Sequence, residues 1–192
     1  MRFKKYLPLI SILAIAVILR FITITRYGDF WFDEMFSFTY SQKPWLLSLK
    51  YWTWETNPPL HMFILKLWFY VFPANEFWAR LPSLIFGILS VWFLYQFVSR
   101  IFNQRIAAIS ALLLTLNAYH IFISTTARGY SLFIMLVILS ADYFFRIFLE
   151  NLTTKKNEII FAFVNCLLIY THLTAINLFL GQIIIIFLTN KK

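Results

Sequence analysis

The sequence predicts an all-α fold: a polytopic transmembrane helical bundle of about six crossings, with interfacial helices in a large first external loop. Composition is the first reason, because 61% of the 192 residues are apolar and only 13% are charged, against about 25% charged in soluble domains. The second is that the apolar residues form long blocks in which Gly (4) and Pro (6) are scarce. These observations exclude a disordered chain and an ordinary cytosolic enzyme. A single cysteine excludes an internal disulfide.

The predicted crossings follow in order from the length that a membrane-spanning helix needs, about 17–25 mostly apolar residues. Basic residues precede the first block and no small-x-small cleavage pattern follows it, so we expect an uncleaved signal anchor with a cytosolic N-terminus. The predicted crossings are Leu7–Thr25, Leu81–Ser99, Ile106–Ser124, Tyr130–Leu149, Ile159–Tyr170 and Ala175–Thr189.

One apolar segment, Pro58–Phe72, is ambiguous because it is short, begins with two prolines and contains Lys66. The positive-inside rule decides its placement, since more than half of the 17 basic residues fall in cytosolic segments only if it does not cross. We therefore expect 26–79 to be one external loop of a protein in the plasma (inner) membrane. The same rule explains the net charge of +9, so no nucleic-acid partner is expected.

The external loop contains six of the seven tryptophans and five of the eight acidic residues. Because Trp and Tyr favour the membrane–water interface, we expect interfacial helices at Phe30–Tyr40, Trp45–Trp54 and Leu60–Phe72, with membrane lipid as a partner. An aromatic belt does not require the adjacent acids Asp33 and Glu34. Acidic side chains near hydrocarbon are costly and usually mark a site.

Several short motifs resemble the GT-C fold membrane glycosyltransferases, in particular the protein O-mannosyltransferase and lipid A aminoarabinose transferase-like family. The segment Trp31-Phe32-Asp33-Glu34 resembles the W-x-D-E element that opens the first external loop of that family. Further elements follow in the same order: Asn57-Pro58-Pro59-Leu60, Ala79-Arg80-Leu81-Pro82-Ser83, Ser124-Thr125-Thr126-Ala127-Arg128-Gly129-Tyr130-Ser131 and Tyr170-Thr171-His172.

Two departures from the family pattern concern the second external loop and the length of the chain. Thr125 and Thr126 stand where the family usually has Gln-Glu, so a typical acid of that loop is absent. The chain has six predicted crossings, whereas family members normally continue through more. We therefore expect 1–192 to be a single module that corresponds to the family's N-terminal part, with its C-terminal part missing.

The resemblance implies transfer of a sugar from a polyprenyl-phosphate-sugar donor to a lipid, glycan or protein acceptor at the outer face of the membrane. A phosphate leaving group needs cations or a metal, and the acceptor hydroxyl needs a base. Asp33 is the predicted base, with Glu34 supporting it or binding a metal. Arg128 and Arg80, and less strongly Lys66, are the predicted phosphate ligands. The other site candidates are Glu55, Asn57, His61, Tyr130 and His172.

A divalent metal, Mg²⁺ or Mn²⁺, is an open alternative as cofactor, with Glu34 and His172 as candidate ligands, although no paired ligand spacing supports one. Arg80, Arg128 and Lys66 have a structural alternative, in which their stems lie along the membrane and their charges reach water. His61 has the alternative of capping the helix that follows the two prolines. His120 is expected to form a helix–helix hydrogen bond, and Asp142 to pair with Arg146 one turn on.

The alternative function class is a noncatalytic membrane protein: a transporter, a flippase component or a scaffold. Transporters place ionisable groups near mid-membrane and interrupt their helices. Here the polar residues gather at the outer ends of the predicted crossings, and the crossings contain few helix breakers. The pattern favours an active site at the membrane surface.

Overall fold

The computed structural model describes residues 3–26 and 28–189, which form helices and connecting segments without any strand. The all-α prediction is confirmed. The elements are α1 (Phe3–Arg26), α2 (Phe32–Ser41), α3 (Trp45–Trp52), α4 (Leu60–Trp68), α5 (Glu76–Ile101), α6 (Gln104–Leu116), α7 (Ala118–Ile123), α8 (Tyr130–Phe144), the π-helical turn η1 (Phe145–Leu149), α9 (Lys155–Thr171) and α10 (Ala175–Thr189).

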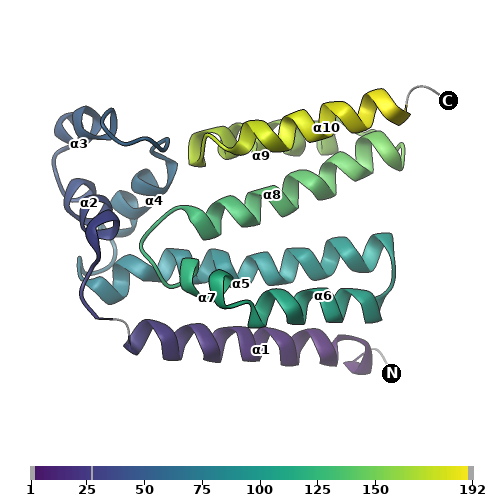
Figure 1. The fold of residues 1–192 in the computed structure, drawn as a ribbon, viewed down its shortest axis with the longest axis horizontal. Coiled ribbons are helices and arrows are strands. Elements are labelled where there is room, and N and C mark those ends of the chain that lie inside the picture. The colour runs from purple at the N-terminus through teal and green to yellow at the C-terminus, as the bar shows by residue number, and fades with distance from the viewer. Residues whose placement is uncertain (1–2, 27, 190–192) are drawn as a thin grey trace.

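The long helices run side by side as a bundle, and α2, α3 and α4 form a cap at one end of it (Figure 1). The beginning of α1 and the end of α10 lie at the opposite end (Figure 1). By length and composition, 7–26, 76–101 and 130–149 are long and apolar enough to cross a membrane, while α6 and α10 are shorter apolar helices. The protein is therefore a helical membrane bundle.

The ambiguous segment contains only α4, whose nine residues span about 14 Å. A bilayer core is about 30 Å thick. The helix lies in the cap rather than along the bundle (Figure 1), so the segments between the long helices alternate between the two ends. The segments 28–75, 124–129 and 172–174 lie at the cap end, and 102–103 and 150–154 at the other.

The predicted crossing Ile106–Ser124 is not one continuous helix, and this part of the prediction is wrong. Helix α6 ends at Leu116, and Asn117 has extended backbone angles (φ −64°, ψ 116°). Its side chain then accepts the backbone N–H of His120 at 2.8 Å and caps α7. Asn competes with the helix by bonding nearby backbone in this way, so one residue divides the crossing in two.

Proline in α5 connects the cap to the bundle. Pro82 has no N–H, so it cannot bond the carbonyl of Trp78 one turn earlier. That carbonyl instead accepts the indole N–H of Trp68, the last residue of α4, at 2.9 Å. A helix defect is thus used to fix α4 against the start of α5.

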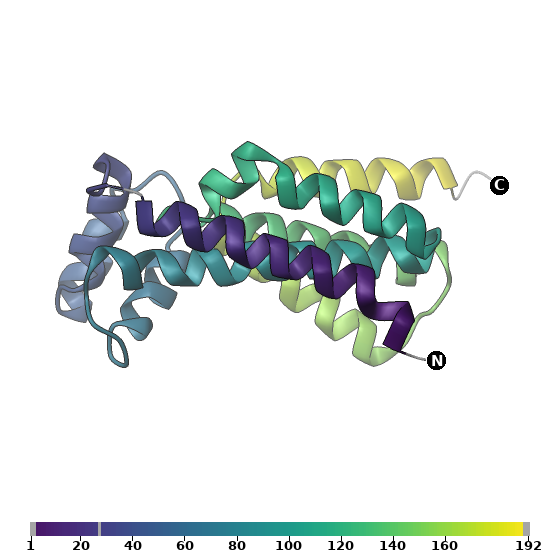
Figure 2. The same cartoon turned by 90° about the horizontal axis from the view of Figure 1, so that it is seen from below.

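Helix α1 lies across α5 and α6 and also contacts α7 (Figure 2). Ala16, Ala107 and Ala111 are fully buried in the core cluster that these helices share, and such small residues let helices approach closely. At the bundle end away from the cap, Asp142 pairs with Arg146 at 2.8 Å, as predicted, and also with Arg100. Many apolar side chains of α1 and α10 are exposed, as expected of surfaces that face lipid.

Candidate functional site

A pocket opens where the cap meets the bundle; its interior volume is about 20 Å³, and about 310 Å³ when the solvent space at its open mouth is included. It collects side chains from α2, the α3–α4 connection, α4, the 124–129 segment, and the α8 and α9 ends that face the cap. We call it the Arg128 pocket. Its lining residues are Ser37, Glu55, Asn57, Pro58, His61, Met62, Arg128, Gly129, Tyr130, Thr171 and His172.

Arg128 is 6% exposed, so its charge does not reach bulk water as the structural alternative required. Its Nη2 donates to Glu55 Oε1 at 2.9 Å. Its Nη1 donates to Ser37 Oγ at 3.1 Å and to the Asp33 carbonyl at 3.3 Å. The guanidinium also lies 5.9 Å from the centre of the Tyr130 ring. These contacts hold one cation in a single orientation at the pocket wall.

The charges around Arg128 keep it ionised. Burial by itself lowers the pKa of Arg128, but the hydrogen bond and negative charge of Glu55, with smaller contributions from Tyr130 and Asp33, raise that pKa above its usual value. Asp33 itself is partly exposed. Among the described residues, no hydrogen bond or ion pair uses its carboxylate; only its backbone carbonyl is an acceptor. Asp33 is therefore an acid close to Arg128 with both carboxylate oxygens available.

His61 is buried beside the pocket and is connected to Arg128 through Ser83. The Ser83 hydroxyl donates to the Arg128 carbonyl at 3.0 Å and lies 3.4 Å from His61 Nε2. Because that hydroxyl has one proton, His61 Nε2 must carry the proton of the second bond. Burial and the charge of Arg128 lower the pKa of His61 to about 3. The backbone of Gly129 lies close to His61, since a Cβ at that residue would lie 3.1 Å from His61 Cβ, closer than an ordinary van der Waals contact.

His172 also lines the pocket, at the end of α9. Its Nδ1 accepts the backbone N–H of Thr174 at 3.2 Å, which places the ring proton on Nε2. Its ring packs against those of Tyr130 and Phe133. Burial and the charge of Arg128 lower the pKa of His172. The one cation thus favours the neutral form of both histidines near it.

Glu34 and Arg80 do not line the Arg128 pocket. They form a sealed ion pair, 0% and 1% exposed, in which Arg80 Nε and Nη2 donate to the two carboxylate oxygens at 2.9 and 3.0 Å. The backbone N–H of Ala127 donates to Glu34 Oε1 at 2.7 Å, and Arg80 also bonds the Gly28 carbonyl. Instead of offering a phosphate ligand and a metal ligand, this pair joins α2, α5 and the 124–129 segment.

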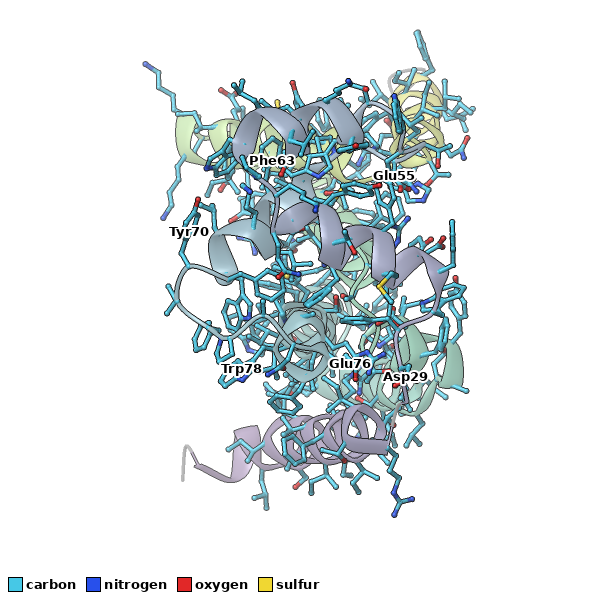
Figure 3. All side chains as sticks on the ribbon, turned by 90° about the vertical axis from the view of Figure 1, so that its left-hand side faces the viewer. Asp29, Glu55, Phe63, Tyr70, Glu76 and Trp78 are labelled. Carbon is cyan, nitrogen blue, oxygen red and sulfur yellow. The ribbon has the colours of Figure 1, made fainter. Side chains whose placement is uncertain are left out.

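Lys66 also lies away from the Arg128 pocket. It is buried, and its Nζ donates to the carbonyls of Ser41 and Lys43 and to Ser48 Oγ. It lines a different pocket together with Tyr70. Figure 3 shows Tyr70 and Glu55 on opposite sides of the cap. Lys66 therefore satisfies the carbonyls that the end of α2 leaves free.

No group of three or more His, Cys, Asp and Glu side chains in the described part of the chain lies close enough to hold a metal ion. The two predicted ligands lie in different surroundings, since Glu34 is bonded to Arg80 and His172 belongs to the Arg128 pocket.

One polar residue that the sequence reasoning missed is Arg20, inside the first predicted crossing. It is fully buried and lies 2.6 Å from His120 Nδ1. This contact confirms the helix–helix hydrogen bond expected of His120. The available signal was a charged residue inside an apolar crossing.

Comparison with known proteins gives one match. The family described as dolichyl-phosphate-mannose-protein mannosyltransferase matches residues 56–192. That range contains Asn57, Arg128 and His172 but begins after Asp33 and Glu34. No curated protein and no solved structure matches. The match covers most of the chain and confirms the expected GT-C glycosyltransferase resemblance: the chain belongs to the dolichyl-phosphate-mannose-protein mannosyltransferase family.

Proposed function

We propose that this chain binds the phosphate of a polyprenyl-phosphate-sugar donor in the Arg128 pocket and transfers the sugar to a lipid, glycan or protein hydroxyl at the outer face of the membrane. Family membership supports glycosyl transfer in general. The observation that carries the more specific proposal is Arg128, a cation held by Glu55 and Ser37 at the wall of an open pocket.

Arg128 retains the capacity to bind a phosphate. A guanidinium has five N–H groups, and three are used by Glu55, Ser37 and the Asp33 carbonyl among the described residues. The two that are left suit a phosphate oxygen, and a charge-assisted bond of this kind is shorter and stronger than a neutral one. Tyr130, Asn57 and His172 would then surround the sugar.

The reaction needs one base. The acceptor oxygen bonds to the anomeric carbon while the bond from that carbon to the phosphate oxygen breaks, and the electron pair leaves with the polyprenyl phosphate. The hydroxyl proton passes to Asp33, whose carboxylate is the acid near Arg128 with no hydrogen bond among the described residues. Arg128 stabilises the charge that develops on the phosphate.

The experiment is transfer of labelled sugar from polyprenyl-phosphate mannose by protein reconstituted in vesicles. Asp33→Asn should reduce the transfer rate by about 10²–10⁴-fold and leave donor binding nearly unchanged, because the amide keeps the shape but cannot take the proton. Asp29→Asn is the matched control, since Asp29 is exposed in the same segment. A full transfer rate in Asp33→Asn would show that Asp33 is not the base. Addition of Mg²⁺ or Mn²⁺ to each arm measures metal dependence.

The outward orientation of the pocket is part of the proposal and has its own test. Single cysteines at exposed Thr56, beside the pocket, and exposed Asn103, at the other end of the bundle, are introduced in a Cys166→Ser background. Thr56→Cys should react with an impermeant thiol reagent from outside, and Asn103→Cys only after permeabilisation. The reverse pattern would place the pocket in the cytosol.

One observation favours the transporter alternative: the helix interruption at Asn117, with Arg20 and His120 beside it inside the bundle. Interrupted helices line transporter sites when they open to a cavity. Here both side chains are at most 2% exposed, which leaves no open path for a cargo. Movement of labelled donor across the vesicle membrane without sugar transfer would support the transporter.

A further inference from the structure

Arg20 occupies an unusual position for a charged residue. It lies in a stripe of α1 that is otherwise apolar and buried, formed with Ile12, Ala16 and Ile24 at four-residue spacing. Its partners among the described residues are the Ala16 carbonyl at 3.2 Å and His120 Nδ1 at 2.6 Å, and neither is a carboxylate. Its Nε has no partner there. An ionisable group at such depth is expensive and marks a functional feature.

The Arg20 contact is directional. Arginine has no acceptor, so His120 Nδ1 accepts and the ring proton lies on Nε2. His120 belongs to α7, and its backbone carbonyl accepts the hydroxyl of Ser124, which starts the 124–129 segment. Arg20 therefore holds the short helix that leads directly to Arg128.

Gly87 of α5 provides the space for this arrangement. A Cβ at Gly87 would lie 2.2 Å from Ser124 Oγ, 2.5 Å from Ser124 Cβ and 3.3 Å from Arg20 Nε. Contacts under 3 Å cannot persist without displacement of Ser124. The start of the 124–129 segment thus lies between α1 and α5. Arg20 of α1 holds it through α7, and Gly87 of α5 leaves space for Ser124 because it has no side chain.

Because of the interruption at Asn117, the position of α7 depends on these contacts with α1 and α5. Because α6 and α7 are separate helices, helix continuity does not determine where α7 lies. The far end of the segment is held by the bonds from Ala127 to Glu34 and from Ser83 to the Arg128 carbonyl. The near end depends on tertiary contacts with α1 and α5.

We infer that Arg20, acting with Gly87 through α7 and Ser124, is a positioning residue that holds Arg128 in its phosphate-binding orientation. The inference rests on the proposed function, because it assigns Arg20 an effect on donor binding. It is distinct from a role in stability alone, which would leave the geometry of the Arg128 pocket unchanged in the molecules that fold.

The test measures binding of decaprenyl phosphate to the purified chain in nanodiscs, beside the thermal midpoint and the hydrogen exchange of the Ser124–Tyr130 peptide. Arg20→Met and Gly87→Ala should each weaken binding roughly 10-fold and raise exchange in that peptide. Ser124→Gly, added to Gly87→Ala, removes both short contacts and should restore binding in part, because the Ser124 hydroxyl bond to the His120 carbonyl is lost while the backbone N–H bond to that carbonyl remains. Arg20→Lys keeps a donor for His120 and should lose less than Arg20→Met.

Val91→Ala is the matched control, because Val91 is buried on α5 one turn after Gly87. It should lower the thermal midpoint and leave affinity unchanged. If Gly87→Ala and Arg20→Met lower affinity no more than Val91→Ala, the positioning role is refuted. If Arg20→Met does not fold, the comparison of Gly87→Ala with the double variant Gly87→Ala, Ser124→Gly decides the question. If Arg128→Gln in the same assay leaves binding unchanged, the proposed phosphate site itself fails, and the inference fails with it.

Discussion

Asp33 and Glu34 are neighbours in sequence but belong to two different regions of the cap. Successive residues of an α-helix point about 100° apart, so α2 turns Glu34 inward to Arg80 and leaves the partly exposed Asp33 near Arg128, outside the set of residues that line the pocket. Both regions combine an arginine with a glutamate. In the first, both glutamate oxygens are bonded and neither side chain is exposed. In the second, the arginine keeps free N–H groups among the described residues and faces a pocket.

Access, rather than residue type, distinguishes the buried Glu34–Arg80 ion pair from the Arg128 region, which lines a pocket. The free-energy cost of removing two charges from water is offset only when their hydrogen-bonding groups are well paired. In the Glu34–Arg80 pair, both carboxylate oxygens accept hydrogen bonds from Arg80. The Arg128 region keeps bonding capacity for a ligand. The following predictions test this division, beginning with the largest effect.

Removing the charge of Glu34 should cause the largest loss of stability. Glu34→Gln should lower the free energy of unfolding by ~3–5 kcal/mol, because it deprives the buried Arg80 of its carboxylate. Tryptophan fluorescence during unfolding in detergent measures this loss. Glu34→Leu combined with Arg80→Met should recover much of it, since apolar replacement of both partners is often neutral. A Glu34→Gln protein that is as stable as wild type but inactive would make Glu34 a reactive group and end the comparison.

Arg128→Gln should have the opposite profile. Affinity for decaprenyl phosphate should fall by about 1.5–3 kcal/mol, roughly 10- to 150-fold, while stability falls less than in Glu34→Gln. Titration of the phosphate into protein in nanodiscs gives the affinity. If Arg128→Gln lowered stability as much as Glu34→Gln, and Glu34→Gln weakened binding as much as Arg128→Gln, the two regions would not be functionally separate.

His61 belongs to the Arg128 region and should make stability depend on pH. The unfolded histidine has a pKa near 6.5 and the folded one a pKa of about 3, so the unfolded state takes up its proton first as the pH falls. Stability is complete above about pH 6.5 and is lost toward pH 3, with ~2 kcal/mol lost between pH 8 and pH 5. His61→Gln should flatten this dependence in thermal unfolding curves. An unchanged slope in His61→Gln would assign it to other groups.

Lys66→Gln should have the smallest effect on donor binding. Because Lys66 bonds the carbonyls at the end of α2 and lines a pocket other than the Arg128 pocket, affinity for decaprenyl phosphate should stay within about twofold of wild type, since only its hydrogen bonds to the cap are lost. The thermal midpoint should fall slightly. A loss of affinity comparable to that of Arg128→Gln would mean that the Lys66 ammonium reaches the donor.

The sequence by itself determined the fold class, the cap and much of the pocket. Composition and block length are properties of the chain read in order, so the helical bundle and the three cap helices followed from them without tertiary information. Short motifs contain Asn57, Arg128, Tyr130 and His172, and the sequence also indicated Glu55 and His61 as candidates; these six residues do line one pocket. Motif order indicated the family as well.

Tertiary structure alone decided which charged residues are sealed and which are accessible. The pairing of Glu34 with Arg80, the burial of Lys66 under the end of α2 and the contact of Arg20 with His120 each join residues that are distant in sequence. Burial and pairing depend on which helix faces meet, and a local pattern of residue types does not specify that. The interruption at Asn117 is local, because the Asn117 side chain caps α7 by accepting the backbone N–H of His120. The position of α7 in the bundle is decided by tertiary contacts such as Arg20–His120, because a local cap does not specify which helix the capped segment packs against.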